Sequence, residues 1–274
     1  MQFNIKKQKH FFNFLHTYKN FFDERKFLLF LDYDGTLTPI ASTPEKAFLS
    51  PSTRRILEAL GQSPQCKVTV VSGRALKDLR KMINLKRLAY VGNHGFEASG
   101  PGIFFESDCF PQARKIFQRV INKTNERLRG VPGVLIEDKG VTLSIHYRLV
   151  DEKKQPWVKK AVWHIAEPFV VSKEIKAFKG KKVYELRPPV DWDKGKIVSW
   201  FIKEYKRDPA WKDALVIYIG DDRTDEDAFE ALASKAVTIC VGDGRKSKAQ
   251  YYVEDTKKVS EVLSMILSSL KREQ

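Results

Sequence analysis

The chain has 274 residues, of which 42% are hydrophobic, so it can bury a substantial core in one large or two ordinary domains. Its formal net charge is +15, but the Lys and Arg residues are spread along the chain without an RNA-binding or zinc-finger signature, which favours a solvated basic surface that attracts anionic small molecules. No run approaches the roughly 18 apolar residues of a membrane helix, the N-terminus lacks the features of a signal peptide, and the three cysteines lack metal-type spacing, so we expect a cytoplasmic globular protein with reduced thiols.

The first 25 residues place apolar side chains such as Phe11, Leu15 and Phe22 at helical spacing, which predicts an N-terminal helical extension over residues 1–25. After it, short apolar runs alternate with helix-like segments. Strands are predicted at residues 26–31, 67–71, 88–91, 215–219 and 236–241, and helices at 52–60, 76–83, 195–205, 224–233 and 259–270. Apolar runs without alternation are typical of strands buried on both faces of a parallel sheet. The predicted fold class is therefore α/β.

The middle of the chain departs from this alternation. Strands are predicted there at residues 134–137, 141–147, 169–173 and 182–186, and helices at 112–128 and 157–166. Glycine-bearing and proline-bearing segments, 92–95 and 187–190, provide plausible hinges at its borders. The pattern predicts an inserted α+β unit over residues 98–187, between two parts of a core domain that comprise residues 26–97 and 188–274.

Two acidic residues follow the first predicted strand. Asp32 and Asp34 come directly after an apolar run, and ligands of parallel sheets bind beyond the carboxyl ends of the strands. Gly35 permits a sharp turn that would expose Asp32. Asp-Gly is also a common turn and an Asp after a strand is a common helix cap, so this motif alone leaves a structural explanation open.

Other predicted strand ends carry polar groups as well. Ser72, in Ser72-Gly73-Arg74, offers a hydroxyl and backbone N–H groups for an anion, although a lone Ser there is more often an N-cap. Five acids fall within residues 221–227, and such crowding favours a bound cation with hard oxygen ligands, such as Mg²⁺. Lys194 opens a predicted helix, where its charge opposes the helix dipole, which indicates a functional role.

These residues resemble, in order, the four motifs of the haloacid dehalogenase-like phosphohydrolases. The matching segments are Asp32-Tyr33-Asp34-Gly35-Thr36, Ser72-Gly73-Arg74, Lys194 and 220–227. Further segments narrow the resemblance to the trehalose-6-phosphate phosphatases, from about Phe27 to the C-terminus. They are 92–97, 137–140, 146–148, 185–188 and the extension of the fourth motif to Phe229.

The resemblance implies a Rossmann-like core with an inserted cap that selects the substrate, and Mg²⁺-dependent hydrolysis of trehalose 6-phosphate. It makes Asp32 the nucleophile that forms an aspartyl-phosphate, Asp34 the general acid and base, and Lys194 a catalytic cation. A phosphate dianion repels a carboxylate, so neutralisation by Mg²⁺ and Lys194 suits this chemistry.

The resemblance also implies binding roles for other positions. The implied metal ligands are Asp32, the backbone carbonyl of Asp34, Asp221 and, directly or through water, Asp222. The implied supporting residues are Thr36 and Asp225, and the sequence leaves open whether Asp225 orients Lys194 or a metal-bound water. The implied substrate-binding residues are Ser72, Gly73, Arg74, Asn93, His94, Glu137, Lys139, Arg148 and Glu185. Residues 137–140 could also be an ordinary turn, His94 could tie down a hinge, and Arg148 could be a surface charge.

Two other functions stay open at this point. One keeps the chemistry but changes the leaving group, as in a phosphatase of another sugar or polyol phosphate, or a phosphomutase. The other is a binding protein that has lost catalysis and contacts nucleic acid, against which the intact motif residues argue. We expect a small-molecule sugar phosphate as substrate, no nucleic acid or membrane partner, a monomer, and a functional link to a trehalose-6-phosphate synthase.

Overall fold

The protein folds into two compact units. The computed structural model describes residues 9–18, 20–23, 25–41, 43–180, 182–243 and 247–271. The first unit, called the core unit below, comprises residues 1–105 and 192–274, and the second, called the inserted unit, comprises residues 106–191.

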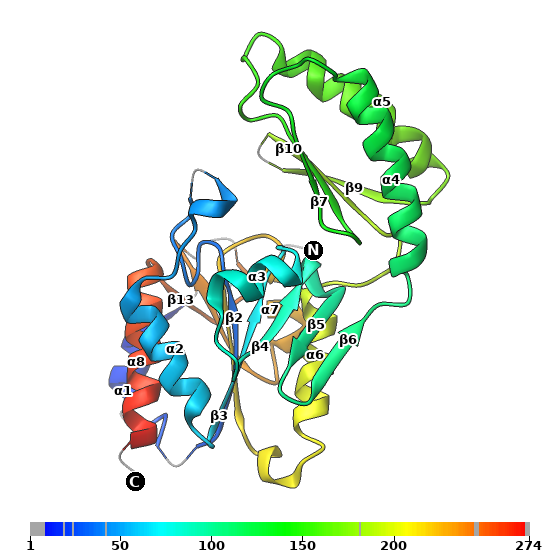
Figure 1. Cartoon of the computed structure of the whole chain (residues 1–274). Helices are drawn as coiled ribbons and strands as arrows, with labels where there is room; N and C mark the ends of the chain where they lie inside the picture. Colours follow the sequence, from blue (N-terminus) through cyan, green and yellow to red (C-terminus); the bar gives the residue numbers. More distant parts are fainter. Residues whose placement is uncertain are drawn as a thin grey trace, which may run out of the picture. The chain divides into compact units, whose positions relative to one another are not determined.

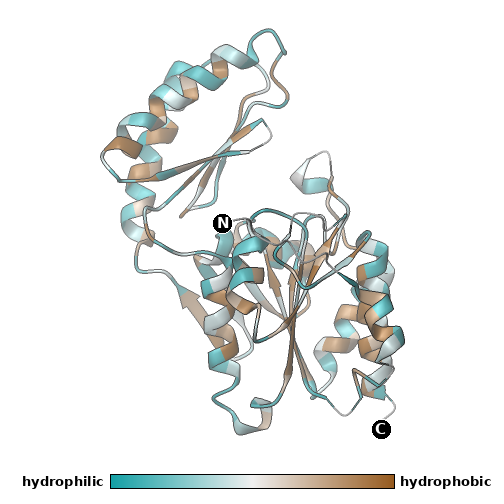
Figure 2. Ribbon diagram, turned by 180° about the vertical axis from the view of Figure 1, so that it is seen from behind, coloured by the Kyte–Doolittle hydropathy of each residue, from teal (hydrophilic) through white to brown (hydrophobic). Residues whose placement is uncertain are grey.

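A nine-stranded sheet lies at the centre of the described part of the core unit (Figure 1). Its order is β1-β13-β12-β11-β2-β3-β4-β5-β6; neighbours from β1 to β4 are parallel, and β5 is antiparallel to β4. The strands are Lys9–His10 (β1), Phe27–Asp32 (β2), Cys66–Val71 (β3), Ala89–Gly92 (β4), Glu97–Gly100 (β5), Ile103–Glu106 (β6), Leu215–Gly220 (β11), Val237–Val241 (β12) and Tyr251–Val253 (β13). Every residue of the central strand β2 is buried, which explains its apolar run, and the strands at the centre of the sheet are largely hydrophobic (Figure 2).

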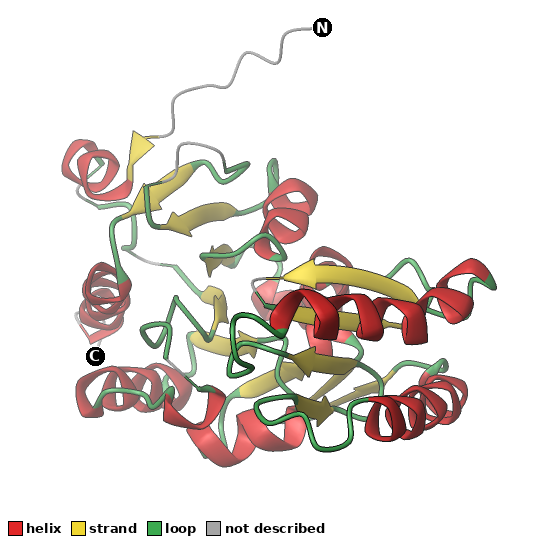
Figure 3. Cartoon of the chain, turned by 90° about the horizontal axis from the view of Figure 1, so that it is seen from above, coloured by secondary structure: helices red, strands yellow, loops and turns green. Residues whose placement is uncertain are grey.

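Helices cover both faces of this sheet, as the view from above shows (Figure 3). The helices of the core unit are Phe11–Thr17 (α1), Pro51–Gln62 (α2), Leu76–Ile83 (α3), Lys194–Tyr205 (α6), Asp225–Leu232 (α7) and Thr256–Lys271 (α8), with short 3₁₀ turns at Pro44–Lys46, Asn93–Gly95 and Pro209–Trp211. Apolar residues of α1, α2, α3 and α8 form one buried cluster, and those of α6 and α7 form another. The predicted α/β class with a Rossmann-like core is confirmed. In the described parts of the chain, we find no helix with the length and apolar character to cross a membrane.

The division between the units lies at 105/106 and 191/192, whereas the sequence placed it at 97/98 and 187/188. The difference at the first border has a simple cause, since β5 and β6 continue the core sheet. At the second border, Trp192 belongs to the core unit, where its indole stacks on Phe105 and donates a hydrogen bond to the carbonyl of Gly95.

The inserted unit is a four-stranded antiparallel sheet with two helices on one face (Figure 1). Its strand order is β7-β8-β10-β9, with β7 at Leu135–Asp138, β8 at Leu143–His146, β9 at Lys176–Gly180 and β10 at Val183–Arg187; α4 is Phe110–Arg127 and α5 is Gln155–Val171. The predicted strand at residues 169–173 is wrong. Phe169 is a buried residue near the end of α5, where it continues the apolar face that begins at Val158.

The N-terminal segment differs from the predicted extension over residues 1–25. Residues 1–8 lie outside the described part, a short strand β1 precedes α1, and α1 covers only Phe11–Thr17. The side chains of Phe11, Leu15 and Phe22 are buried in the same cluster as the core helices α2 and α8. The apolar positions therefore pack against the core, but one helix does not contain them all.

Candidate active site

Three neighbouring strands of the core sheet end at residues to which the sequence assigns chemistry. β2 ends at Asp32, while β3 is followed by Ser72 and β11 by Asp221. β2 pairs in parallel with both β3 and β11, so the three ends lie at one edge of the sheet. In open α/β sheets this is the edge at which ligands bind.

Lys194 is a buried cation at this edge. It is the first residue of α6, whose start is capped by the carboxylate of Asp193, and it is 2% exposed. Its Nζ lies 2.7 Å from Oδ1 of Asp32 and 2.8 Å from Oδ1 of Asp225. Burial alone would lower the pKa of Lys194, but the carboxylates of Asp225 and Asp32 raise it well above its ordinary value. Lys194 therefore stays protonated and holds a fixed positive charge beside Asp32.

Asp225 is fully buried and uses both carboxylate oxygens as hydrogen-bond acceptors. Oδ1 accepts from Lys194 and, at 2.6 Å, from the hydroxyl of Tyr218. Oδ2 accepts from the backbone N–H groups of Asp221 and Asp222, each at 3.0 Å. Asp225 thus holds Lys194 in place and fixes the loop after β11. The sequence motifs did not indicate Tyr218, because this residue lies within the apolar run of β11.

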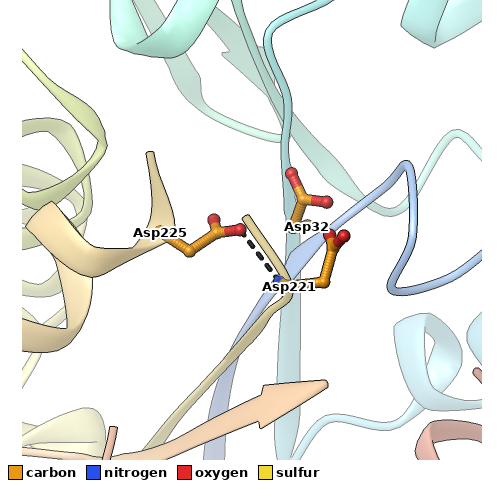
Figure 4. A group of neighbouring side chains, drawn as sticks. All are labelled: Asp32, Asp221 and Asp225. Atoms are coloured by element: carbon orange, nitrogen blue, oxygen red, sulfur yellow. Dashed lines mark hydrogen bonds between the residues drawn. The ribbon is translucent and has the colours of Figure 1, made fainter. Parts of the chain in front are cut away.

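Three carboxylates gather where a cation could bind. One oxygen from each of Asp32, Asp221 and Asp225 lies within 4.8 Å of the others (Figure 4). Because Asp225 already accepts four hydrogen bonds, Asp32 and Asp221 are the members of this group with oxygen atoms to offer. Burial, with a smaller contribution from Asp225 and Asp222, raises the pKa of Asp221 to about 7. Crowded carboxylates and a donor set of oxygens fit a hard divalent cation such as Mg²⁺.

Asp222, predicted as a further metal ligand, lies outside this group. Its Oδ1 accepts from the backbone N–H and the hydroxyl of Thr224, both at 2.7 Å, and from the N–H of Asp225 at 3.2 Å. Burial would raise the pKa of Asp222, but Lys194 and the hydrogen bond from Thr224 hold it well below its ordinary value. One oxygen of Asp222 thus fixes the start of α7, and its role as a metal ligand stays a prediction.

Asp34 is more exposed than Asp32 and is paired with Arg74. The Arg74 guanidinium donates from Nε to Oδ2 at 2.7 Å and from Nη2 to Oδ1 at 2.6 Å, and it lies 5.4 Å from the ring centroid of Tyr33. The side chains of Asp34 and Arg74 are 39% and 12% exposed. The structure therefore brings together a residue predicted for proton transfer and one predicted for phosphate binding.

Gly35 makes the turn that connects the two acids of the first motif to the rest of the site. Its φ of +89° is in the left-handed region, and its N–H bonds the carbonyl of Thr38 at 2.7 Å. A Cβ at this position would overlap the carboxylate of Asp221. Thr36, in the same turn, donates its hydroxyl to Oδ1 of Asp221 at 3.3 Å. The turn after β2 and the loop after β11 are therefore packed directly together.

The predicted residues at the ends of β3 and β4 also lie side by side. The carbonyl of Ser72 accepts from the N–H of His94 at 3.0 Å, and the carbonyl of Arg74 accepts from the N–H of Asn93 at 2.7 Å. Asn93 and His94 both have left-handed backbone angles, with φ of 50° and 56°. A Cβ at Gly73 would meet the imidazole of His94. These five residues thus form two interlocked turns.

The remaining predicted residues belong to the inserted unit. Glu137 of β7 and Glu185 of β10 both pair in register with Ser144 of β8, so they point to the same face of that sheet. The Nζ of Lys139 lies 3.6 Å from Oε2 of Glu137. Arg148 is exposed in the turn that follows β8. The structure groups Glu137, Lys139 and Glu185 on one sheet, and their roles stay predictions.

Comparison with known proteins agrees with this geometry. The family model described as trehalose-phosphatase matches residues 30–258. The chain is 31% identical over 267 residues to trehalose-phosphate phosphatase B of Arabidopsis thaliana, covering 90% of this chain and 70% of that protein. It is 32% identical over 248 residues to trehalose-phosphate phosphatase of Mycobacterium marinum, covering 88% of this chain and 62% of that protein.

A solved structure of a trehalose-6-phosphate phosphatase domain is also similar to this chain. The C-terminal domain of C. albicans trehalose-6-phosphate phosphatase is 25% identical, with a TM-score of 0.77, and the match covers 96% of this chain and 99% of that one. The family model spans the motifs at the ends of β2, β3 and β11 and the whole inserted unit. The chain belongs to the trehalose-phosphatase family.

Proposed function

We propose that this protein is a Mg²⁺-dependent phosphomonoesterase that hydrolyses trehalose 6-phosphate to trehalose and inorganic phosphate through an aspartyl-phosphate on Asp32. The observation that carries the proposal is the position of Asp32, which lies at the end of β2 beside the protonated amine of Lys194 and the carboxylate of Asp221. Asp32 and Asp221, with the backbone carbonyl of Asp34 and with Asp222, would hold Mg²⁺. The cation would neutralise the phosphate dianion so that a carboxylate can approach it.

The residues of the chain divide the chemistry between them. A carboxylate oxygen of Asp32 attacks phosphorus, and the bond from phosphorus to the sugar oxygen breaks. Asp34 gives a proton to the leaving sugar oxygen and then takes one from the water that attacks the aspartyl-phosphate, which releases phosphate and restores Asp32. Lys194 and Ser72 bind the phosphoryl oxygens, while Thr36 and Asp225 keep Asp221 and Lys194 in position.

Arg74 connects substrate binding to this proton transfer. Both oxygens of Asp34 accept from the Arg74 guanidinium, which holds the carboxylate in one orientation, and opening this pair would free Asp34 to turn toward the leaving oxygen. An arriving phosphate offers the guanidinium a second set of oxygens. In this proposal Arg74 binds the phosphate and thereby releases Asp34, with Gly73, Asn93 and His94 forming the adjacent wall.

The inserted unit acts as the cap that selects the leaving group. Glu137, Lys139 and Glu185 hydrogen-bond sugar hydroxyls, and Arg148 contributes from the neighbouring turn. We place the reaction in the cytoplasm and assign it to a monomer that uses trehalose 6-phosphate made by a trehalose-6-phosphate synthase.

Phosphate release from a panel of sugar phosphates, with Mg²⁺ and with EDTA, tests the proposal. Trehalose 6-phosphate should have the highest kcat/KM, and EDTA should abolish turnover. Equal rates across the panel would refute the assignment of trehalose 6-phosphate and leave a general sugar phosphatase. Conversion of one sugar phosphate to another without phosphate release would indicate a phosphomutase.

A further inference from the structure

One face of the sheet in the inserted unit is covered by helices and is apolar. Tyr184 of β10 and Ile145 of β8 lie opposite each other in register, and both are buried. The ring of Tyr184 stacks on Trp163 of α5, with 6.2 Å between ring centroids. Tyr184 therefore points to the helices, and side chains one position along each strand point to the other face.

That second face, called the open face below, carries one continuous row of residues across all four strands. Ser144 and Glu185 lie opposite each other on the two central strands, and their partners on the outer strands are Glu137 and Phe178. The row therefore reads Glu137, Ser144, Glu185, Phe178 from β7 to β9. Directly opposite residues lie close enough to contact one ligand together.

Charges of both signs lie in contact with each other on the open face. Oε2 of Glu137 lies 3.1 Å from Nε2 of His146 and 3.6 Å from Nζ of Lys139, and Oε1 of Glu185 accepts from Nε of Arg187 at 3.1 Å. Each carboxylate thus has a permanent cation beside it, and Lys176, opposite Arg187 on β9, adds a third cation whose Nζ donates to the carbonyl of Val190. An anion would meet the carboxylates, whereas an uncharged ligand rich in hydroxyls can donate to the carboxylates and accept from the cations.

Phe178 adds an exposed aromatic ring to this polar row. The residue is 45% exposed on the edge strand β9, and the guanidinium of Arg187 lies 4.7 Å from its ring centroid. The Arg187 side chain is itself 10% exposed and bonded to Glu185, so it braces the ring beside that carboxylate. A flat apolar surface next to a hydrogen-bonding carboxylate matches a pyranose ring, which has an apolar C–H face and an equatorial belt of hydroxyls.

We infer that Phe178 is a further sugar-binding residue of the open face: a pyranose ring stacks on Phe178, beside Glu185, which Arg187 holds in position as an acceptor for the hydroxyls. The inference rests on the proposed function and extends it. It makes Phe178 a residue that determines specificity for the sugar. Phe178 is not one of the motif residues.

The test compares Phe178→Ala and Phe178→Tyr with a matched control, Trp157→Ala. Trp157 lies on α5 in the same unit and is 46% exposed, so truncating it removes a similar exposed aromatic side chain from a helix. The readout is the ratio of kcat/KM for the best sugar phosphate of the panel to kcat/KM for p-nitrophenyl phosphate. Phe178→Ala should lower this ratio about tenfold or more, the scale of a lost buried aromatic contact. Phe178→Tyr keeps an aromatic ring, so its ratio should stay within about threefold of the wild-type ratio. Trp157→Ala should leave the ratio unchanged.

The other possible results of this experiment separate the inference from the proposed function. A wild-type preference for trehalose 6-phosphate that survives Phe178→Ala would overturn the inference and leave the proposed function intact. Equal losses on both substrates, or an equal loss in Trp157→Ala, would mean that Phe178 supports the fold and would also overturn it. A wild type that prefers another hexose phosphate, with the ratio still dependent on Phe178, would uphold the inference and refute trehalose 6-phosphate. A wild type that prefers no sugar phosphate over the aryl ester would refute both.

Discussion

Replacing Asp221 by Asn should stabilise the metal-free protein at alkaline pH, although it removes a proposed metal ligand. Burial and the nearby carboxylates raise the pKa of Asp221 from its ordinary value of 3.8 to about 7. A carboxyl group with a raised pKa stabilises the fold fully only below its unfolded pKa, and this contribution is lost as pH rises through the folded pKa. At about 1.36 kcal/mol per pKa unit, the pKa difference corresponds to about 4 kcal/mol. This figure is an upper limit, because the loop can relax toward water. Asn carries no charge and avoids this cost.

Urea unfolding in EDTA at pH 5 and pH 8 measures the effect. The stability advantage of Asp221→Asn over wild type should grow between these pH values by up to about 2.5 kcal/mol. Mg²⁺ should stabilise the wild type at pH 8 and leave the variant unchanged, because ligand binding to the native state alone raises the free energy of unfolding.

The adjacent Asp222 is the matched control, because its effect has the opposite sign. The pKa of Asp222 is held below its ordinary value, so its ionised form stabilises the fold at every pH above 3.8. Asp222→Asn should therefore be less stable than wild type at both pH 5 and pH 8. If Asp221→Asn were also less stable than wild type at pH 8 without metal, the argument from carboxylate crowding would be refuted.

Four further variants test the proposed catalytic and specificity residues and the hydrogen-bond network around Asp225. Asp32→Asn should reduce phosphate release to background, whereas Asp34→Asn should lose about 10²- to 10⁴-fold in kcat and accumulate phosphorylated protein on p-nitrophenyl phosphate, detectable by intact mass; normal turnover in Asp32→Asn would disprove its role as nucleophile. Lys139→Ala should lower kcat/KM for trehalose 6-phosphate about 10- to 150-fold and change aryl phosphate hydrolysis much less, and parallel losses on both substrates would assign Lys139 to the fold instead. Tyr218→Phe keeps the ring but removes the 2.6 Å hydrogen bond to Asp225, so urea unfolding should show a loss of about 1.5 to 3 kcal/mol, and unchanged stability would contradict this network.

The core of the fold could be predicted because its strands are buried on both faces. β2 and β11 read as uninterrupted apolar runs, and the sequence predicts each of them to within one residue of its observed ends. The edge strand β9 gave no such signal. β9, with the sequence Lys-Ala-Phe-Lys-Gly, is largely exposed and charged, which suits an edge but hides it from a search for apolar runs. The β-branched pair after Pro168 suggested a strand, but Pro168 lies inside α5.

The candidate site was predictable to a similar, limited extent. Asp32 and Asp221 stand out because Asp32 ends a buried strand and Asp221 directly follows one. The pairing of Asp34 with Arg74 could not be read from the chain, since it depends on how the turns after β2 and β3 meet. Tyr218 was missed for a different reason: its ring belongs to the apolar core, and only its hydroxyl reaches Asp225.

The overlap between a side chain at Gly35 and the carboxylate of Asp221 has a consequence for genetics. A Gly35→Ala allele would displace Asp221, so a screen for metal dependence should class it with changes in the proposed metal ligands, although position 35 itself has no proposed contact with the metal. Shortening Asp221 should not rescue such an allele, because the space gained would come from the oxygen atoms that the proposed metal site needs. Intolerance of substitution at position 35 therefore marks a packing constraint between two distant loops, and loss of function there should not be taken as evidence of direct catalysis.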